Sequence, residues 1–205
     1  TTSLSVYEEN KLLGVHIFPV GAVNITNDLA VWLRIPVSAA ENLKLQYGFA
    51  IASEVGAKET IELKKFAPEA KNVVSRRFVS EIIESRLAEI LEFVNNELKL
   101  MGKVGRLAGG VVFTGGGAKM PGLTELAKQE LRLTSQIGLA GEGSRWTKEG
   151  NISFDESLED PEFVNSLGLL LWGMDREGWH TEEKKSFSAL ASWKGLKDLF
   201  RSFLP

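Results

Sequence analysis

The sequence predicts an α/β fold in which short strands alternate with helices, and α+β is the alternative. Three observations indicate this class. The chain opens with alternating polar and apolar residues, which is typical of a strand hairpin. One long segment carries apolar residues at helical spacing. Past the middle, a short apolar run leads through three consecutive glycines into a helical pattern.

The composition is that of an ordinary globular protein. The 205 residues suffice for one large or two small domains, and they are 43% hydrophobic and 25% charged. A net charge of −3 speaks against a general nucleic-acid binder. The absence of cysteine excludes disulfides, thiolate metal sites and cysteine nucleophiles, and it fits a reducing cytoplasm.

We expect a fragment of a longer chain, because the sequence does not begin with Met, and we expect no secretory signal. The longest strongly apolar stretch, residues 167–172, is far shorter than the roughly 18 residues that span a bilayer. Any membrane contact is therefore expected to be peripheral.

The first half of the chain predicts a hairpin followed by helices. The expected elements are strands at 1–7 and 12–20, a helix at 26–33, a helix at 39–47 with Ser38 as its N-cap, a strand at 59–63, and the longest helix at 75–101. The last of these carries the apolar stripe Phe78, Ile82, Leu87, Ile90, Leu91, Val94 and Leu98.

The second half predicts shorter elements and a separate terminal helix. The expected order is a buried strand at 109–113, a helix from 121 to about 133, a strand at 136–140, a polar loop at 141–158, a helix at 161–174, a charged linker at 176–186 and a helix at 187–205.

The glycine turn, Gly115, Gly116 and Gly117, is the sharpest chemical motif. Glycines remove every Cβ from the turn, so a flat ligand can lie directly on the backbone. The following helix points free N–H groups at the same place, which suits the sugar and phosphates of a nucleotide. The segment is not a P-loop, and Met120 breaks the dinucleotide fingerprint. A tight turn without a ligand is the alternative.

The terminal helix, residues 187–205, is amphipathic. Its apolar arc and basic flank suit a helix lying among anionic lipid headgroups. The residues expected to contact the membrane are Trp193, Leu196, Leu199, Phe200, Phe203, Lys194, Lys197 and Arg201. Two alternatives remain, namely a helix docked on the core of its own domain and a helix that fills a groove on a partner protein.

Four segments in order resemble the FtsA family, bacterial cell-division homologues of actin. Residues 112–118 with 121–123 resemble its adenosine motif, and residues 1–6 the tail of its second phosphate loop. Residues 21–30 resemble its Gly-Gly-x-x-Ile-Thr-x-Asp segment, with Ala22 in place of the second glycine. Residues 39–48 resemble its Ala-Glu-x-Leu-Lys-x-x-Tyr-Gly helix.

The resemblance implies the second half of an actin-like (ribonuclease H-like) ATPase fold with an inserted smaller subdomain. Residues 1–21 and 108–175 would form the inner subdomain, 2A, and residues 22–107 the insertion, 2B. The function implied is a cell-division protein that binds ATP with Mg²⁺, polymerises with itself, and tethers FtsZ filaments to the cytoplasmic face of the membrane at the division site. Other division proteins are further possible partners.

The resemblance also assigns nucleotide contacts. Gly115, Gly116 and Gly117 would pack against the adenosine and α-phosphate. Thr1, Thr2 and Gly21 would lie near the phosphates. Glu41 and Lys44 would reach the ribose and adenine, although without the resemblance they would be interpreted as an i,i+3 ion pair on a solvated helix face.

The first phosphate loop and most of the second are not in this sequence, so the fragment is expected to bind nucleotide weakly or not at all and not to hydrolyse it. At most a weak ATPase is expected of the full-length protein, and no catalytic residue is proposed.

The long helix at 75–101 is the expected surface for the FtsZ tail, with Arg86 as the main contact. Arg76 and Arg77 are secondary candidates. The alternative is a surface charge paired with Glu81, Glu84 or Glu89. Neither His16 nor His180 has metal-ligand spacing. Alternative functions are a pilus-assembly scaffold and a sugar or acetate kinase-like enzyme of the actin superfamily.

Overall fold

The computed structural model describes residues 1–70, 72–139 and 160–176, and it divides into two compact units. The first unit is Thr1–Asn165 and the second begins at Ser166. The predicted loop at 141–158, the linker and the terminal helix lie outside the described residues. The finer division into subdomains at residues 21 and 107 stays a prediction.

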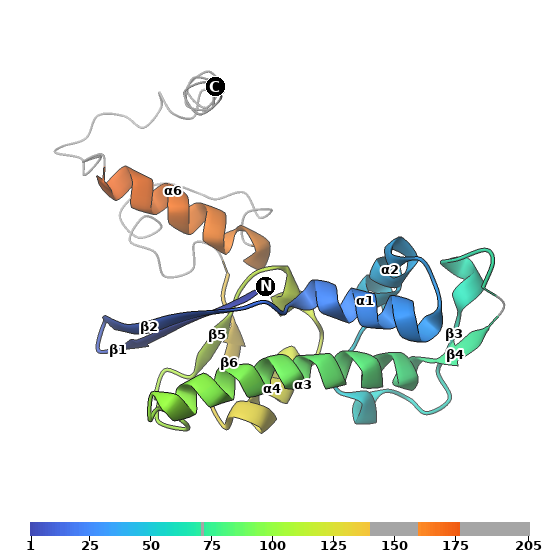
Figure 1. Ribbon diagram of the computed structural model, residues 1–205, viewed down its shortest axis with the longest axis horizontal. Helices are drawn as coiled ribbons and strands as arrows, with labels where there is room; N and C mark the ends of the chain where they lie inside the picture. Colours follow the sequence, from blue (N-terminus) through green and yellow to red (C-terminus); the bar gives the residue numbers. More distant parts are fainter. Residues whose placement is uncertain (71, 140–159, 177–205) are drawn as a thin grey trace, which may run out of the picture. The chain divides into compact units, whose positions relative to one another are not determined.

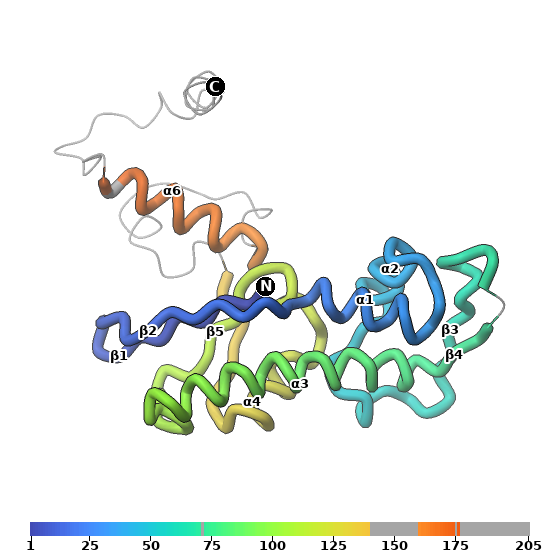
Figure 2. The backbone as a smooth tube through the Cα atoms, viewed as in Figure 1, coloured from blue at the N-terminus to red at the C-terminus, as the bar shows by residue number. Residues whose placement is uncertain are grey.

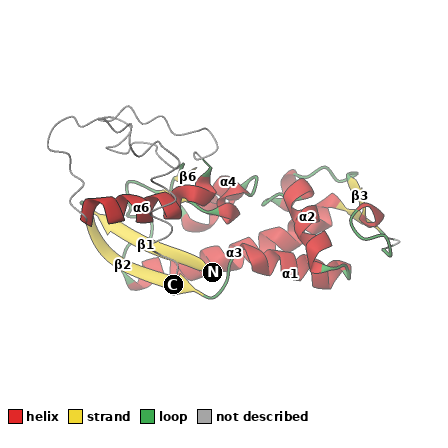
Figure 3. Cartoon of the chain, turned by 90° about the horizontal axis from the view of Figure 1, so that it is seen from above, coloured by secondary structure: helices red, strands yellow, loops and turns green. Residues whose placement is uncertain are grey.

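The chain begins with the predicted hairpin. β1 (Thr2–Glu8) pairs antiparallel with β2 (Lys11–Phe18), with a register shift between Val6 and Tyr7. Glu9 and Asn10 form the two-residue loop, and both have positive φ, which matches the twist of a tight hairpin. Figure 3 shows the two strands side by side.

Two helices follow, and both begin earlier than the sequence predicted. α1 (Ala22–Leu33) starts four residues early because Gly21 caps it, its N–H donating to the Asn24 side chain at 3.0 Å. α2 (Val37–Tyr47) starts at Val37 behind Pro36, so Ser38 lies inside the helix and is not its N-cap. Proline supplies a backbone geometry compatible with a helix start. The prediction missed this start because it relied on the preference of hydroxyl side chains for the N-cap.

The long helix α3 (Arg76–Leu100) matches the prediction and organises the first unit. It follows the antiparallel pair β3 (Thr60–Glu62) and β4 (Val73–Ser75), and 3₁₀ turns lie at Ala52–Glu54 and Leu63–Lys65. Every residue of its predicted apolar stripe is buried except Phe78. In Figures 1 and 2, α3 runs alongside both the hairpin and α1.

The hydrophobic core forms where one face each of α1, α2 and α3 pack together. Ile25 and Leu29 of α1, Leu43 of α2, and Ile83 and Leu91 of α3 are all almost fully buried. Burying such large aliphatic side chains removes apolar surface from water, which is the main force holding the helices together. The same cluster extends to α4 through Leu126 and Leu131.

The second half builds a parallel crossover. β5 (Val111–Phe113) pairs parallel with β6 (Ser135–Ile137), and α4 (Leu123–Leu131) connects them. The helix begins two residues later than predicted, because Gly122 takes a left-handed conformation at its N-cap. The predicted burial of this strand was wrong at Val112, which is 51% exposed, because successive side chains of a strand point to opposite faces and only Val111 and Phe113 are partly buried.

The predicted helix at 161–174 is a 3₁₀ turn, η5 (Pro161–Phe163), followed by α6 (Val164–Arg176). Asp160 caps the turn by accepting the Glu162 N–H at 2.9 Å. Among the described residues, no helix is both long enough and apolar enough to cross a membrane.

Candidate functional site

The glycine turn joins β5 to the 3₁₀ turn η3 (Gly116–Lys119). Gly115 has a φ of +86°, a conformation that side chains disfavour, and a Cβ there would meet no atom of the described residues within 4 Å. The other two glycines face protein. A Cβ on Gly116 would lie 3.2 Å from the Glu162 carboxylate, and one on Gly117 would lie 3.4 Å from the Ala22 methyl. An open backbone face is therefore present at Gly115 alone of the three.

The start of α1 meets this turn and the amino terminus of the chain. Gly21 is buried, and a Cβ there would lie 2.8 Å from the backbone N and O of Thr1. Glycine is required at this position for the close approach of two backbones. The Thr2 hydroxyl donates its single proton to the Val20 carbonyl at 2.8 Å, so in this arrangement it can only accept a hydrogen bond from a ligand.

A polar triangle on α1 and α2 adjoins the turn. Lys44 Nζ donates to Glu41 Oε2 at 2.8 Å and to Thr26 Oγ1 at 2.9 Å, and Thr26 Oγ1 also donates to Glu41. Lys44 is 8% exposed, so it is not on a solvated face, although the i,i+3 ion pair does form. Its third proton reaches the Ala22 carbonyl at 3.4 Å, at the residue that touches Gly117.

Thr26 was missed as a site residue. The signal for it was present in the sequence, since Thr26 is a polar residue next to Ile25 and one turn before Leu29 on the buried face of α1. A hydroxyl on an apolar helix face needs a partner.

The Glu41 carboxyl has a depressed pKa. Burial raises it, but the hydrogen bonds from Lys44 and Thr26 together outweigh burial and bring the pKa below its ordinary value of 4.5. The carboxylate therefore stays ionised at neutral pH. Because Lys44 and Thr26 both engage Oε2, the other oxygen remains an acceptor for a ligand hydroxyl.

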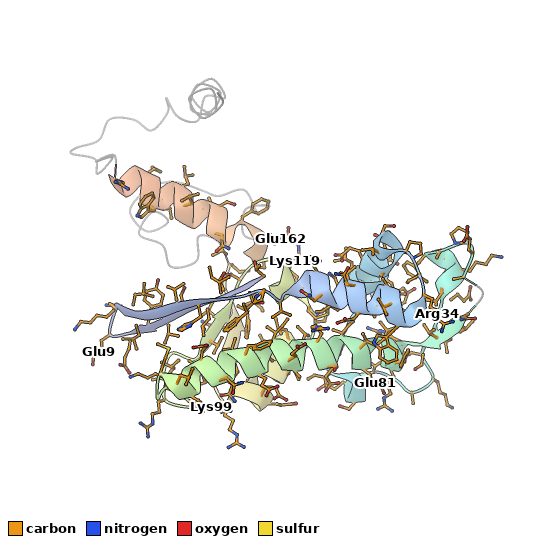
Figure 4. All side chains as sticks on the ribbon, in the orientation of Figure 1. Glu9, Arg34, Glu81, Lys99, Lys119 and Glu162 are labelled. Atoms are coloured by element: carbon orange, nitrogen blue, oxygen red, sulfur yellow. The ribbon has the colours of Figure 1, made fainter. Side chains whose placement is uncertain are left out.

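An ion-pair cluster of Lys119, Asp160 and Glu162 also contacts the turn. Lys119 Nζ donates to Asp160 Oδ2 at 2.7 Å and to Glu162 Oε1 at 3.2 Å, and Figure 4 labels Lys119 and Glu162 close together. The hydrogen bonds to Asp160 and then Glu162 raise the pKa of Lys119, and Lys119 lowers the pKa of Asp160. No sequence pattern pointed to this cluster.

Arg86 lies beside a groove between α1 and α3. The aromatic groove has a volume of about 300 Å³ and is lined by Asp28, Trp32, Phe78, Glu81, Ile82, Ser85, Arg86 and Glu89. Arg86 binds Asp28 through two hydrogen bonds, at 2.6 and 2.9 Å, and also pairs with Glu89. The pairing with Glu89 that the alternative interpretation named is present, whereas Asp28 was not foreseen as a partner. The hydrogen bond to Asp28 raises the pKa of Arg86.

The glycine turn, the polar triangle and the groove occur in a chain with clear relatives. A profile of the family described as "Cell division protein FtsA" matches residues 1–168. The chain belongs to the FtsA family. Cell division protein FtsA of Bacillus subtilis is 36% identical over 170 residues, and that of Pseudomonas aeruginosa is 28% identical over 177 residues. These matches cover 83% and 86% of this chain but only 36% and 40% of the relatives.

Solved structures agree on an actin-like fold for this FtsA-family chain. MreB5 of Spiroplasma citri, solved with ADP, aligns at a TM-score of 0.59 and 13% identity, covering 87% of this chain and 52% of that one. The PilM–PilN type IV pilus biogenesis complex aligns at 0.56 and 21% identity, covering 83% and 42%. At such low identity, the likeness concerns the fold alone.

The other residues singled out from the sequence either have hydrogen-bond or ion-pair partners within this FtsA-family chain or lie outside the described residues. Arg76 donates to the Tyr47 carbonyl at 3.0 Å, and Arg77 donates to the Ala52 carbonyl at 3.1 Å, so both hold the loop before β3. His16 pairs with Glu97 at 3.2 Å, and no metal-binding cluster of three or more acidic, His or Cys residues occurs in the described part of the chain. His180 and the proposed membrane residues fall outside that part.

Proposed function

We propose that this chain is the nucleotide-binding and membrane-tethering part of an FtsA-type division protein that binds ATP and polymerises. One observation carries the nucleotide claim. The glycine turn, the start of α1 and the polar triangle, which are far apart in sequence, join through Gly117, Ala22 and Lys44. Actin-like folds place a nucleotide where such segments converge, and the resemblance of these segments to the adenosine motifs of the family supports the same placement.

The residues present fit a nucleoside and its first phosphate. Gly115, whose N–H is bound to the Pro161 carbonyl, offers a face without a Cβ to a flat group, and Glu41 uses only one of its two oxygens within the described residues, so the other can accept a ribose hydroxyl. Lys44 has all three protons engaged, so its role is to hold Glu41 and the start of α1 in place. The described residues offer no cluster for Mg²⁺, so the ligands of that ion would come from elsewhere in the full-length protein.

The aromatic groove is the proposed docking surface for the FtsZ tail. Trp32 is 67% exposed and stands edge-on to Phe78 at 6.5 Å, and exposed aromatic pairs of this kind are typical anchors at protein interfaces. Arg86 would hold a carboxylate of the tail, although Asp28 already occupies it. Docking of an acidic peptide would therefore require Arg86 to exchange Asp28 for the peptide.

Membrane attachment is assigned to the helix that the sequence predicts at residues 187–205. Large apolar residues opposite lysine and arginine favour an interfacial helix on an anionic surface. One short helix binds reversibly, and polymerisation would multiply its hold through avidity. A pilus-assembly scaffold or a kinase-like enzyme remains the alternative from the same superfamily, but the family match favours the division protein.

Calorimetric titration of ATP tests the nucleotide claim. The full-length protein that carries this chain is expected to bind ATP, and Lys44→Met is expected to weaken binding about tenfold by releasing Glu41 and α1. The 205 residues alone are expected to bind weakly or not at all. Lys65→Met is the matched control, because Lys65 forms an exposed i,i+3 pair with Glu62. Nanomolar ATP affinity of the isolated chain, or no affinity of the full-length protein, would contradict the proposal.

A further inference from the structure

The segment that carries Glu162 is fastened to the glycine turn by three hydrogen bonds. The Gly115 N–H donates to the Pro161 carbonyl at 2.8 Å, and Lys119 binds both Asp160 and Glu162. These bonds fix the Glu162 carboxylate over Gly116, where a Cβ would lie 3.2 Å from Oε1. Figure 4 shows that Lys119 and Glu162 come from different elements and meet at the turn. A negative group therefore stands beside the backbone that the nucleotide would touch.

The negative charge of the Glu162 carboxylate limits which part of a nucleotide can lie beside it. Lys119 offsets part of the negative charge of Asp160 and Glu162, but the ion-pair cluster still carries a net charge of −1. A phosphate next to it would be repelled. An ionised carboxylate can only accept hydrogen bonds, and the donors of a nucleotide are its ribose hydroxyls and the exocyclic amine of its base. The cluster therefore suits the nucleoside part of the ligand.

We propose that Glu162, held against Gly116 by Lys119, recognises the nucleoside by accepting an O–H or N–H hydrogen bond from its ribose or its base. Lys119 and Asp160 are positioning residues in this arrangement. The inference rests on the proposed nucleotide function and adds to it a residue that distinguishes one nucleotide from another.

Nucleotide titrations of the full-length protein test the proposal. The ligands are ATP, 2′-deoxy-ATP, 3′-deoxy-ATP and ITP, which replaces the amine of adenine by an oxygen. Glu162→Ala is expected to weaken ATP binding about tenfold, the usual range for a hydrogen bond to a charged group. The ligand that lacks the relevant donor should bind the parent protein and the variant equally. A deoxy ligand identifies the ribose as the source, and ITP identifies the base.

Lys119→Met should reduce the difference in affinity between ATP and the ligand that lacks the donor. Lys119→Arg should restore that difference, because arginine can still bind two carboxylates. The matched controls are Glu130→Ala and Lys128→Met, at exposed positions of α4, and both should leave every affinity unchanged. Thermal unfolding of each variant checks that the fold is kept.

Equal relative affinities for all four ligands in the parent protein and in Glu162→Ala would overturn the inference while leaving ATP binding intact. A parent protein that binds none of the ligands would overturn the proposed function, and the inference with it.

Discussion

At the scale of single residues, the polar triangle of Thr26, Glu41 and Lys44 is the main feature. It places an ammonium group in an almost fully buried position and satisfies all three of its protons. Burying a charge is costly unless it is paired and hydrogen-bonded, so the geometry of this triangle must be maintained closely. The same bonds fix α2 against the start of α1, beside the glycine turn.

The stability of the chain should depend on Lys44. Lys44→Met is expected to lower the free energy of unfolding by about 1–3 kcal/mol, because the Glu41 carboxylate and the Ala22 carbonyl lose their donor. Urea unfolding of the 205-residue chain measures the change. Lys65→Met, in an exposed pair of the same spacing, should cost less than about 0.5 kcal/mol. Equal effects of the two changes would contradict the role given to burial.

The contribution of Glu41 should depend on pH. Its pKa in the folded chain lies below the ordinary value of 4.5, so its ion pair stabilises the fold fully above that value. The stabilisation is lost as the pH falls from about 4.5 through the lower folded pKa. The difference in unfolding free energy between the parent chain and Glu41→Gln should be constant near neutrality and shrink in this acidic window. A difference independent of pH would refute the assignment.

Substitutions of two residues in the aromatic groove should change the affinity for the FtsZ tail peptide in opposite directions. Asp28→Asn should release Arg86 and strengthen binding of the FtsZ tail peptide several-fold, whereas Arg86→Glu should weaken it about tenfold or more. Fluorescence anisotropy of a labelled peptide measures both. Tyr7→Ala, an exposed aromatic residue on the hairpin, serves as the control. Unchanged affinity in Arg86→Glu would remove Arg86 from the interface.

At the scale of elements, α3 connects the groove to the hairpin. Its amino-terminal half carries Arg86, and its carboxy-terminal half holds β2 through the stacked pair Phe18 and Phe93, whose ring centroids are 5.8 Å apart. The His16 imidazole lies 3.2 Å from the Glu97 carboxylate, and Glu8 forms an ion pair with Lys103. The hairpin is therefore held by this aromatic contact and two weaker polar ones, in addition to Val6 and Phe18, which belong to the same hydrophobic core as α3.

Removing the aromatic contact should loosen the hairpin selectively. Phe93→Ala is expected to lower the unfolding free energy by about 1–2 kcal/mol and to speed amide hydrogen exchange in β1 and β2. Leu100→Ala is the control on the same helix, since Leu100 is 81% exposed and its loss should cost less than about 0.5 kcal/mol. Unaltered exchange in the hairpin would show that the stack does not hold it.

At the scale of the whole molecule, the chain combines a compact first unit with a terminal segment proposed to bind membrane. The first unit, Thr1–Asn165, contains both candidate sites, and the family match covers almost the same range, residues 1–168. The chain spans about two fifths of the length of the relatives compared with it, so the ATP binding and polymerisation proposed above concern the full-length protein.

Membrane binding should depend on the apolar arc of the predicted terminal helix. Trp193→Glu is expected to abolish flotation of the chain with anionic liposomes, because a charge would enter the acyl boundary. Trp179→Glu, in the predicted linker, is the matched control and should float like the parent chain. Liposomes without anionic lipid should bind more weakly, since each basic residue near an anionic surface adds about 1 kcal/mol. Normal flotation of Trp193→Glu would exclude this arc as the anchor.

The sequence alone determined the mixed class, the hairpin, the span of α3, the glycine turn and the family. These features rest on local signals: the spacing of apolar residues, turn chemistry and short motifs. Glu41 with Lys44 could likewise be predicted, because residues three apart on a helix are neighbours. The helix starts at Ala22 and Val37 were missed because a glycine and a proline, not hydroxyl side chains, begin those helices.

Only the tertiary structure decided which distant groups meet. Thr26 joins Lys44, Asp28 holds Arg86, and Glu162 reaches the glycine turn from 46 positions beyond Gly116. No local pattern encodes such pairs, because each depends on how helices pack once their apolar faces are buried. Among the described residues, the same packing places protein atoms against the Cβ positions of Gly116 and Gly117 and none against that of Gly115.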